Sequence, residues 1–378
     1  MKKVCILTSV HPVFDTRIFY KEAQTLAKAG YDVTLIVQHD KNEVIDRIKI
    51  IALSKPKNRF YRILFLTRRV YKLALEQKAD IYHFHDPELL PWMVRLKNKT
   101  EAKIIYDVHE DVPQDILSKH WIPKILRNPL SKIVDFYEKK VAKRTDFIIV
   151  VNPLIKENFE SRGIKNIQVI SNYPISEKFK EVKEIKNNYF DQKEKKTRLI
   201  FVGGLSEESG IKEIVEAVEF LKGKAELLLV GSFEDKKLER EVKEKSEFGV
   251  KFIGRVPHKR VFYYLNQADI GMVCFRPLPN YINTGFGSNK LFEYMGVGLP
   301  VIVSDFPELK KIVEGNRCGI CVNPLEPKEI AKAVEYLIEH PEEAKEMGEN
   351  GRKAVLEKYN WENESKKLLK VYETLCAE

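Results

Sequence analysis

KVCILTSVHPVFDTRIFYKEAQTLAKAGYDVTLIVQ, residues 3–38, holds two short β-branched runs with a stretch of helical periodicity between them. The helical stretch stops at Gly30, and glycine commonly ends a helix because it adopts the left-handed conformation without strain. Strands that alternate with helices usually lie parallel in one sheet. This passage therefore predicts a β-α-β unit within a sheet that helices cover on both faces.

The same alternation runs through the rest of the chain and is interrupted once. It continues to about residue 151 and starts again at RLIFVGG, residues 198–204. The lysine-rich passage 176–197 lacks a core-facing stripe, as is typical of a domain boundary, and 378 residues are too many for one core. We predict two doubly wound parallel-sheet domains with these bounds: an N-terminal Rossmann-like domain over 1–178, a linker over 179–197, a C-terminal Rossmann-like domain over 198–360, and a helix over 361–378 that could pack back on the first domain.

Composition excludes several classes of protein. No apolar run approaches the roughly 18 residues of a membrane-spanning helix, and the first residues do not resemble a signal peptide, so we expect a cytoplasmic protein. Five cysteines, an odd number, fit a reducing compartment better than a disulfide framework. Cys318 and Cys321 have the spacing of a metal or redox pair, but GICV, residues 319–322, has the pattern of a buried strand. We favour the strand.

Positive charge is concentrated in the first half of the chain. The net charge is +10, of which residues 1–180 carry +12. SKPKNRFYRILFLTRRVYK, residues 54–72, contains no acid and places Phe60, Ile63, Leu64 and Val70 at helical spacing. Two interpretations stay open: residues 55–72 contact anionic lipid at the inner face of a membrane, or an ordinary helix turns its apolar stripe to the core. No nucleic-acid-binding module is found, and we expect no nucleic-acid partner.

A glycine-rich loop in the second half predicts an anion site. GFGSNKLFE, residues 285–293, follows an apolar strand and opens a helix, so its backbone amides and the helix N-terminus face a ligand together. Lys290 falls in the first turn, where the helix dipole disfavours a cation unless an anion lies nearby. Glu293, one turn on, could accept two hydrogen bonds from a ribose diol. Alternatively, Ser288 or Asn289 caps the helix and Glu293 stabilises the helix start.

Several passages carry a resemblance to a known family. In the second half they are FVGGLSEESGIKEIVEAV, VKFIGRVPHKRVFYYLNQADIGMVCF, NKLFEYMGVGLPVIVSDFPE and YNWENESKKLLKVYETL. In the first half they are DTRIFYKEAQTLAKAGYDVTLI, HFHDPELLP and YDVHED. In this order and spacing they resemble glycosyltransferase family 4 over nearly the whole chain. The resemblance implies the GT-B fold, which consists of two facing Rossmann-like domains with a cleft between them.

The resemblance also implies an activity. The family transfers a sugar with retention from a nucleotide-diphosphate donor, most often a UDP-sugar, and requires no metal or other cofactor. We therefore expect a glycan or lipid-linked acceptor in cell-surface polysaccharide biosynthesis. The alternative is a non-catalytic sugar-nucleotide-binding or scaffold subunit of the same fold. A nicotinamide-dependent dehydrogenase is excluded because G-x-G-x-x-G follows neither first strand.

The family's donor site transfers to this chain in part. Its ribose-binding glutamate matches Glu293, but a second glutamate, an arginine and a lysine that it usually has are replaced by Gly285, Gly204 and Ser209. The diphosphate charge could instead be met by Lys290, Lys212 or Arg276. Arg255 either borders the base or is an exposed loop charge. The implied donor contacts are Gly203, Gly204, Arg255, Val256, Gly285, Phe286, Gly287, Ser288, Asn289, Lys290 and Glu293.

The acceptor side of the site is predicted in the first domain. The resemblance gives His109, at the end of a strand, the role of orienting donor and acceptor, and with Glu293 it is the expected catalytic residue. The acceptor-side residues are His11, Asp15, Arg17, His85, Asp86 and Glu110. Alternatively, Arg17 and Lys21 are helix-surface charges and His109 is a packing residue. His83, His85, Asp86 and Glu88 are metal-capable, but the prediction is that there is no metal site.

Overall fold

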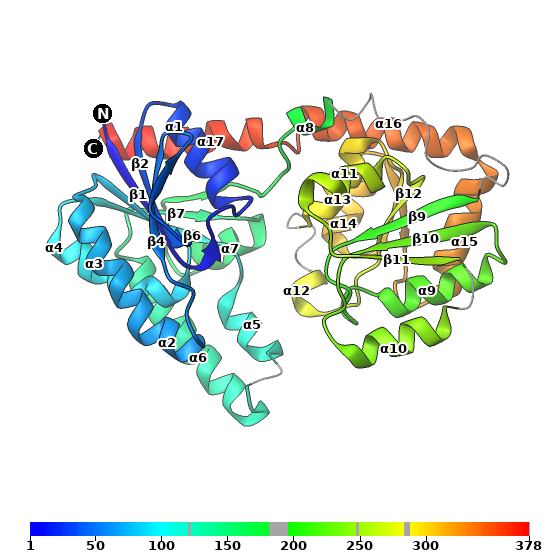
Figure 1. Cartoon of the computed structure of the whole chain (residues 1–378), viewed down its shortest axis with the longest axis horizontal. Coiled ribbons are helices and arrows are strands. Elements are labelled where there is room, and N and C mark those ends of the chain that lie inside the picture. Colours follow the sequence, from blue (N-terminus) through cyan, green and yellow to red (C-terminus); the bar gives the residue numbers. More distant parts are fainter. Residues whose placement is uncertain (120–121, 181–195, 247–248, 283–287, 378) are drawn as a thin grey trace. The chain divides into compact units, whose positions relative to one another are not determined.

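The computed structural model describes residues 1–119, 122–180, 196–246, 249–282 and 288–377 and divides into two units (Figure 1). Unit 1 comprises Met1–Asn172 and Trp361–Glu378, and unit 2 comprises Tyr173–Asn360. The first stretch of unit 1 thus ends at Asn172, whereas the sequence suggests a boundary after residue 178. Most of the predicted linker, residues 181–195, lies outside the described residues.

Unit 1 is built on a sheet of eight strands in the order β3-β4-β2-β1-β5-β6-β7-β8. Every neighbouring pair is parallel except β3 with β4. The sheet is doubly wound, because the chain moves from β1 to one edge and then crosses back to continue at β5. The strands are β1 (Lys3–Pro12), β2 (Asp32–Gln38), β3 (Glu43–Ile45), β4 (Ile48–Leu53), β5 (Ile81–Phe84), β6 (Lys103–Val108), β7 (Phe147–Val150) and β8 (Ile167–Val169).

Helices cover both faces of this sheet, because right-handed crossovers in opposite directions place helices on opposite sides. On one face, the C-terminal helix α17 packs against η1 and α1; on the other, α3 packs against α4 and α4 against α6 (Figure 1). The helices are η1 (Ile18–Ala23), α1 (Gln24–Lys28), α2 (Arg59–Tyr61), η2 (Arg62–Leu66), α3 (Thr67–Gln77), η3 (Pro87–Leu89), α4 (Leu90–Lys99), α5 (Val112–Ser118), α6 (Lys124–Ala142), α7 (Pro153–Ser161) and α17 (Trp361–Ala377).

Unit 2 repeats the architecture with six parallel strands in the order β11-β10-β9-β12-β13-β14. The strands are β9 (Thr197–Val202), β10 (Ala225–Val230), β11 (Val250–Gly254), β12 (Ile270–Val273), β13 (Val301–Ser304) and β14 (Gly319–Val322). The helices are α8 (Glu177–Lys180), α9 (Ile211–Phe220), α10 (Lys236–Lys245), α11 (His258–Leu265), α12 (Pro279–Ile282), α13 (Asn289–Val297), α14 (Pro307–Gly315), α15 (Pro327–Glu339) and α16 (Pro341–Glu357). The predicted fold class of two doubly wound sheets is confirmed.

Two further predictions are tested at this level. The strand interpretation of GICV is confirmed by β14, and all five cysteines are free. The interpretation that turns the apolar stripe of residues 54–72 to the core is correct for Val70, which is buried, and wrong for Phe60 and Leu64, which are 79% and 62% exposed. Among the described residues, no helix is both long enough and apolar enough to cross a bilayer.

Candidate donor site and acceptor-side cluster

The candidate donor site of unit 2 lies where its sheet changes direction. β9 has β10 on one side and β12 on the other, and doubly wound sheets bind ligands beyond the carboxyl ends of their strands at such a switch point. Gly203 and Gly204 follow β9 directly, and Phe275 lies just beyond β12. The first turn of α13 brings Lys290 to this edge, so the predicted loop and the first strand meet.

The ammonium group of Lys290 rests on the turn after β9. Its Nζ lies 4.0 Å from the centre of the Phe201 ring and 5.0 Å from that of Phe275. A Cβ at Gly203 would lie only 3.0 Å from this Nζ, so the glycine makes room for the amine. Burial lowers the pKa of Lys290 to about 7, and the charge of Glu293 opposes the shift. The site therefore holds a cation that is poorly compensated.

The other two cations that the sequence offers for a diphosphate are already paired. Lys212 Nζ lies 2.7 Å from Glu241 Oε2, and Arg276 Nη1 lies 2.8 Å from Glu207 Oε1. No carboxylate in the described part of the chain forms an ion pair with Lys290. Of the three candidates, Lys290 is the one with no carboxylate at ion-pair distance among the described residues, although the charge of Glu293 acts on it.

The residues around Lys290 on α13 also keep polar groups available. Ser288 occupies the N-cap position, yet its side chain makes no capping hydrogen bond, and its buried Oγ has no partner among the described residues. Asn289 is the first residue of the helix and not its cap. Glu293 lies one turn further on and is half-buried; burial lowers the pKa of both Lys290 and Lys178, and the charge of Glu293 acts against that shift.

The structure describes some of the remaining predicted donor residues and not others. Gly285, Phe286 and Gly287 lie outside the described residues. Arg255 is exposed after β11, while Val256 is half-buried against the core. A Cβ at Gly204 would lie 3.1 Å from Glu234 Oε1, so one carboxylate borders the turn where the family usually carries an arginine.

In unit 1, the predicted acceptor-side residues gather at the equivalent switch point, between β1 and β5. His11 Nδ1 lies 3.2 Å from Asp15 Oδ2, and its Nε2 lies 3.6 Å from Asp86 Oδ1. Asp86 accepts hydrogen bonds from the backbone and hydroxyl of Ser9. Although burial opposes it, the hydrogen bond to Asp15 and the charge of Asp86 raise the pKa of His11. His11 thus holds a proton more readily than an ordinary histidine.

Arg17 lies at the centre of a buried ionic network. Its Nη2 donates to Asp107 Oδ2 at 2.8 Å, its Nη1 donates to the carbonyl of Ile170 at 2.9 Å, and its Nε lies 2.9 Å from Glu22 Oε1. Lys21 is also buried and donates to the carbonyl of Asn172 at 3.1 Å. The alternative that treats Arg17 and Lys21 as helix-surface charges is therefore wrong, because both side chains turn inward from η1 to contact groups far along the chain.

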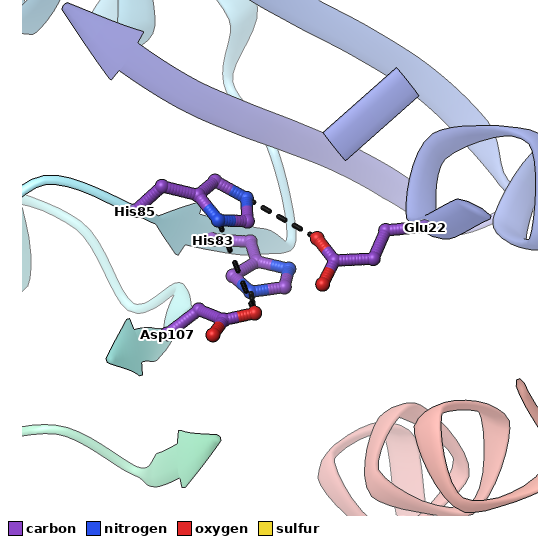
Figure 2. A group of neighbouring side chains, drawn as sticks. All are labelled: Glu22, His83, His85 and Asp107. Atoms are coloured by element: carbon purple, nitrogen blue, oxygen red, sulfur yellow. Dashed lines mark ion pairs between the residues drawn. The ribbon is translucent and has the colours of Figure 1, made fainter. Parts of the chain in front are cut away.

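Figure 2 shows four buried side chains that converge, Glu22, His83, His85 and Asp107, of which Glu22 and Asp107 also contact Arg17. Each offers one metal-capable atom, and these atoms lie within 4.8 Å of one another. A divalent cation here would lie beside the Arg17 guanidinium, which already contacts both carboxylates. If one of the two carboxylates keeps its proton, the charge of the other balances that of the guanidinium. We therefore interpret the group as an ionic network and not as a metal site.

The two carboxylates of this network differ in protonation. Burial raises the pKa of Glu22 well above its ordinary value, and the nearby charge of Asp107 adds to the effect. Burial also acts to raise the pKa of Asp107, but Arg17 and His109 hold it well below its usual range. Two adjacent carboxylates seldom both ionise in a buried site. Asp107 therefore carries the negative charge and Glu22 retains the proton.

His109 belongs to the same cluster and is more accessible to solvent than His85 and Asp107. Its Nε2 lies 3.1 Å from His85 Nδ1 and 3.6 Å from Asp107 Oδ1, and its side chain is half-buried. Burial lowers the pKa of His109 to about 4, so the imidazole is neutral at physiological pH. Glu110 beside it is exposed, and a hydrogen bond with Asp115 raises the pKa of its carboxyl to about 7.

The sequence offered a different metal-capable set from the one that converges. Glu88 turns away to Arg62, with Nε 2.9 Å from Oε1, and Asp86 faces β1. Glu22 was missed, and Tyr372, whose hydroxyl lies 2.8 Å from His83 Nδ1, was missed as well. The signal for Glu22 was its position on the helix that carries Arg17, but its partners lie on strands about 60 to 85 residues away.

Comparisons with known proteins agree with this geometry. The family model described as Glycosyltransferase Family 4 matches residues 16–173, and the one described as Glycosyl transferases group 1 matches residues 182–354. Between them they cover both units. The chain belongs to glycosyltransferase family 4.

Two relatives are similar to this glycosyltransferase over most of its length. It is 26% identical over 337 residues to MJ1069, an uncharacterised glycosyltransferase of Methanocaldococcus jannaschii, covering 84% of this chain and 79% of the relative. A second one from that organism, MJ1178, is 25% identical over 93% of both chains.

Among solved structures, sucrose-phosphate synthase from Thermosynechococcus elongatus matches with a TM-score of 0.80 at 19% identity over 100% of both chains. HepE from Anabaena, solved in complex with UDP-glucose, matches with a TM-score of 0.69 at 15% identity, also over 100% of both chains. At such identities the likeness establishes the fold, which is GT-B.

Proposed function

We propose that this glycosyltransferase transfers a sugar, with retention, from a nucleotide-diphosphate donor of the uridine type to a glycan or lipid-linked acceptor in cell-surface polysaccharide biosynthesis. The observation that carries the donor assignment is the Lys290 ammonium, held over the Gly203 turn between two aromatic rings without an acid partner among the described residues. HepE, a structural neighbour, was solved with UDP-glucose, and this supports the choice of nucleotide.

Lys290 supplies the charge that the absent arginine and lysine usually give. A half-buried ammonium whose pKa is lowered to about 7 gains much of its stabilisation from a partner anion, and a diphosphate provides one. The unpartnered Ser288 hydroxyl and the first amides of α13 add donors on the same side. Glu293 then accepts hydrogen bonds from the ribose.

In the reaction, these donors stabilise the negative charge that develops on the leaving diphosphate. The acceptor hydroxyl attacks from the face that the diphosphate leaves, as retention requires. His109 stays neutral and orients the reacting groups; it lies 3.6 Å from Asp107, whose carboxylate is held by Arg17. The acceptor-side residues His11 and Asp86 border this position on the neighbouring strands.

Residues 55–72 contribute a contact with a membrane, which would bring the enzyme to a lipid-linked acceptor at the inner face. The exposed Phe60 and Leu64 beside basic residues support this part of the proposal. No metal ion or other cofactor is required for the step as proposed, because the charge on the leaving group is met by side chains and amides.

The donor assignment is tested by thermal shift and by nucleotide release with a panel of nucleotide-diphosphate sugars. A ligand that binds the native state raises its apparent stability. Lys290→Ala is expected to weaken UDP binding about ten- to a hundredfold, the loss of one charged contact. Lys212→Ala, which removes an ion-paired lysine, is the matched control and should leave the affinity unchanged.

Three outcomes are informative. Equal affinities of the Lys290 variant and the wild type would exclude Lys290 as the diphosphate contact. Glu234→Gln should tighten binding severalfold, because it removes the carboxylate beside Gly204. Tight binding of a UDP-sugar without any nucleotide release, even with a glycan acceptor present, would favour the non-catalytic subunit instead.

A further inference from the structure

The long helix α6 exposes apolar side chains where a surface helix usually carries polar ones. Its 19 residues contain Ile125, Ile133 and Phe136, which are 84%, 64% and 69% exposed. Positions 125, 129, 133 and 136 lie on one face of a helix. This solvent-facing apolar stripe contributes nothing to the core of unit 1.

The acidic and basic side chains of α6 differ in their surroundings. Its two acids both pair with Arg162: Asp135 through Nη2, and the buried Glu138 through Nη1 at 3.0 Å. Lys132 and Lys140 are exposed beside the apolar stripe. The exposed face of α6 is therefore apolar and basic, with its negative charges neutralised from within the unit.

A second surface of the same character lies on α2 and η2. Phe60, Leu64 and Phe65 are exposed there, and Tyr61 stacks on Phe65 with ring centres 5.4 Å apart. Arg59 is exposed in the same segment, and residues 54–72 contain no acid.

The α2–η2 surface and the start of α6 lie at the carboxyl edge of the unit 1 sheet. A helix that follows a parallel strand begins near the end of that strand, and α2 and η2 precede α3 at this edge. α6 is about 28 Å long at 1.5 Å per residue, against about 20 Å for the six residues of β6, so its first turns extend past the sheet. Figure 1 shows α2 and α6 reaching the same end of unit 1.

A basic groove lies between these surfaces. It has a volume of about 650 Å³ and lies between α3 and α4, the pair of helices that separates η2 from α6 in this layer. Arg68, Lys72, Arg95 and Lys99 line it, together with Trp92 and Tyr71, and no acid does. Its chemistry suits a phosphate headgroup.

We propose that the exposed faces of α6, α2 and η2 and the groove between α3 and α4 form one docking surface for an anionic phospholipid bilayer. Large apolar side chains interleaved with lysine and arginine are typical of helices that lie in a membrane interface, whereas lysine is depleted at protein–protein interfaces. The α2–η2 part of this surface and the start of α6 lie at the sheet edge that carries His85 and His109, so an acceptor embedded in the bilayer would be presented to that edge. The inference extends the proposed membrane contact to a second helix and rests on that contact.

The experiment is vesicle flotation of the full chain with phosphatidylcholine alone and with added phosphatidylglycerol. We expect binding to the anionic vesicles only, weakened by salt. The paired substitutions Ile133→Ser with Phe136→Ser, and separately Phe60→Ser with Leu64→Ser, should each lower the bound fraction about tenfold or more. Val44→Ser, on β3 and 70% exposed in the wild type, is the matched control and should bind normally.

Each contrary result has a distinct meaning. If the α6 variant floats normally and the α2–η2 variant does not, the proposed role of α6 in membrane binding is overturned. The proposed contact of residues 55–72 is then left intact. Absence of flotation by the wild type overturns both. A dimer in size-exclusion chromatography that the α6 substitutions dissociate would assign this face to a second copy of the chain and overturn the lipid assignment. Nucleotide release without acceptor, measured on the same variants, should be unchanged throughout.

Discussion

Lys290 is a half-buried lysine whose protonation depends on whether an anion is bound. In the free protein its pKa is about 7, compared with about 10.4 for an exposed lysine. Between these two pH values the unfolded chain carries a proton on Lys290 that the folded chain has lost. Lys290 therefore lowers the free energy of unfolding by its full amount below about pH 7, and this loss shrinks as the pH rises towards about 10.4. A diphosphate that occupies the site returns the pKa towards its ordinary value.

Nucleotide binding should therefore take up protons. At about pH 8.5 we expect close to one proton per UDP bound, and at about pH 6 almost none, because the amine is already charged. Calorimetric titration in buffers of different ionisation enthalpy measures this number directly. Lys290→Ala should abolish the uptake, and uptake that persists in this variant would assign the proton to another group.

Asp107 and Glu22 lie together but should respond differently to neutralisation. Asp107→Asn leaves the buried Arg17 without its charged partner and is expected to cost roughly 3–5 kcal/mol. Glu22→Gln replaces a carboxyl that already holds its proton and should cost no more than about 1 kcal/mol. Trp92 and Trp361 belong to unit 1, so tryptophan fluorescence during urea unfolding reports this unit. Equal losses for the two variants would show that Glu22 is ionised.

Single residues were readable from the sequence when their signal was local. Lys290 and Glu293 were predicted because they follow a glycine-rich loop at the start of a helix. Their distance from the helix N-terminus indicates which part of a ligand each could contact. Arg17 carried no such signal, since its partner Asp107 lies 90 residues away and only the folded sheet joins them. Glu22 was missed for the same reason.

At the scale of elements, α13 and α16 pack through two glycines. A Cβ at Gly348, within α16, would lie 2.2 Å from the carbonyl oxygen of Gly298, which ends α13 at a φ of +86°. Gly348→Ala should therefore destabilise unit 2 by about 1–3 kcal/mol, as overpacking typically does. Gly315→Ala, at the end of α14 with nothing within 4 Å, should stabilise by up to about 1 kcal/mol. Calorimetric unfolding compares the two, and a tolerated Gly348→Ala would mean that the helices separate freely.

Elements with strong periodicity were predictable, and the rest were not. The parallel strands are apolar runs between helices, so most of β1–β14 follows from pattern alone. The edge strand β3 has three half-exposed or exposed residues and no apolar pattern to detect. The helix α16 was missed because two glycines and many charges hide its narrow buried stripe. The direction of the α6 stripe was equally hidden, since periodicity gives a face but not the side on which it lies.

At the scale of the whole molecule, α17 ties the end of the chain to unit 1. Glu364 accepts a hydrogen bond from the Ser171 amide at 2.9 Å, and Trp361 Nε1 donates to Thr25 Oγ1 at 3.0 Å. The helix also buries Leu368, Val371 and Leu375. At about 1.5–3 kcal/mol for each large buried side chain, this packing rivals the net stability of a typical domain, about 5–15 kcal/mol.

A chain that ends at Asn360 should therefore lose the folded state of unit 1 and keep that of unit 2. Hydrogen exchange resolved by peptide measures both at once: protection should disappear from β1 and β5 and persist in β9 and β12. Full protection of β1 in the shortened chain would show that α17 is dispensable. Glu364→Gln, which removes one charge from the contact, is the milder companion variant.

The membership of α17 in unit 1 has a consequence for synthesis on the ribosome. The first hundred and seventy residues emerge early but must wait for α17, which is translated only after every residue of unit 2. Unit 2 can then mature before its predecessor, which reverses the order of emergence. A nascent chain stalled before α17 has left the ribosome would display an open first half, and chaperones that protect newly made proteins would meet it in that form.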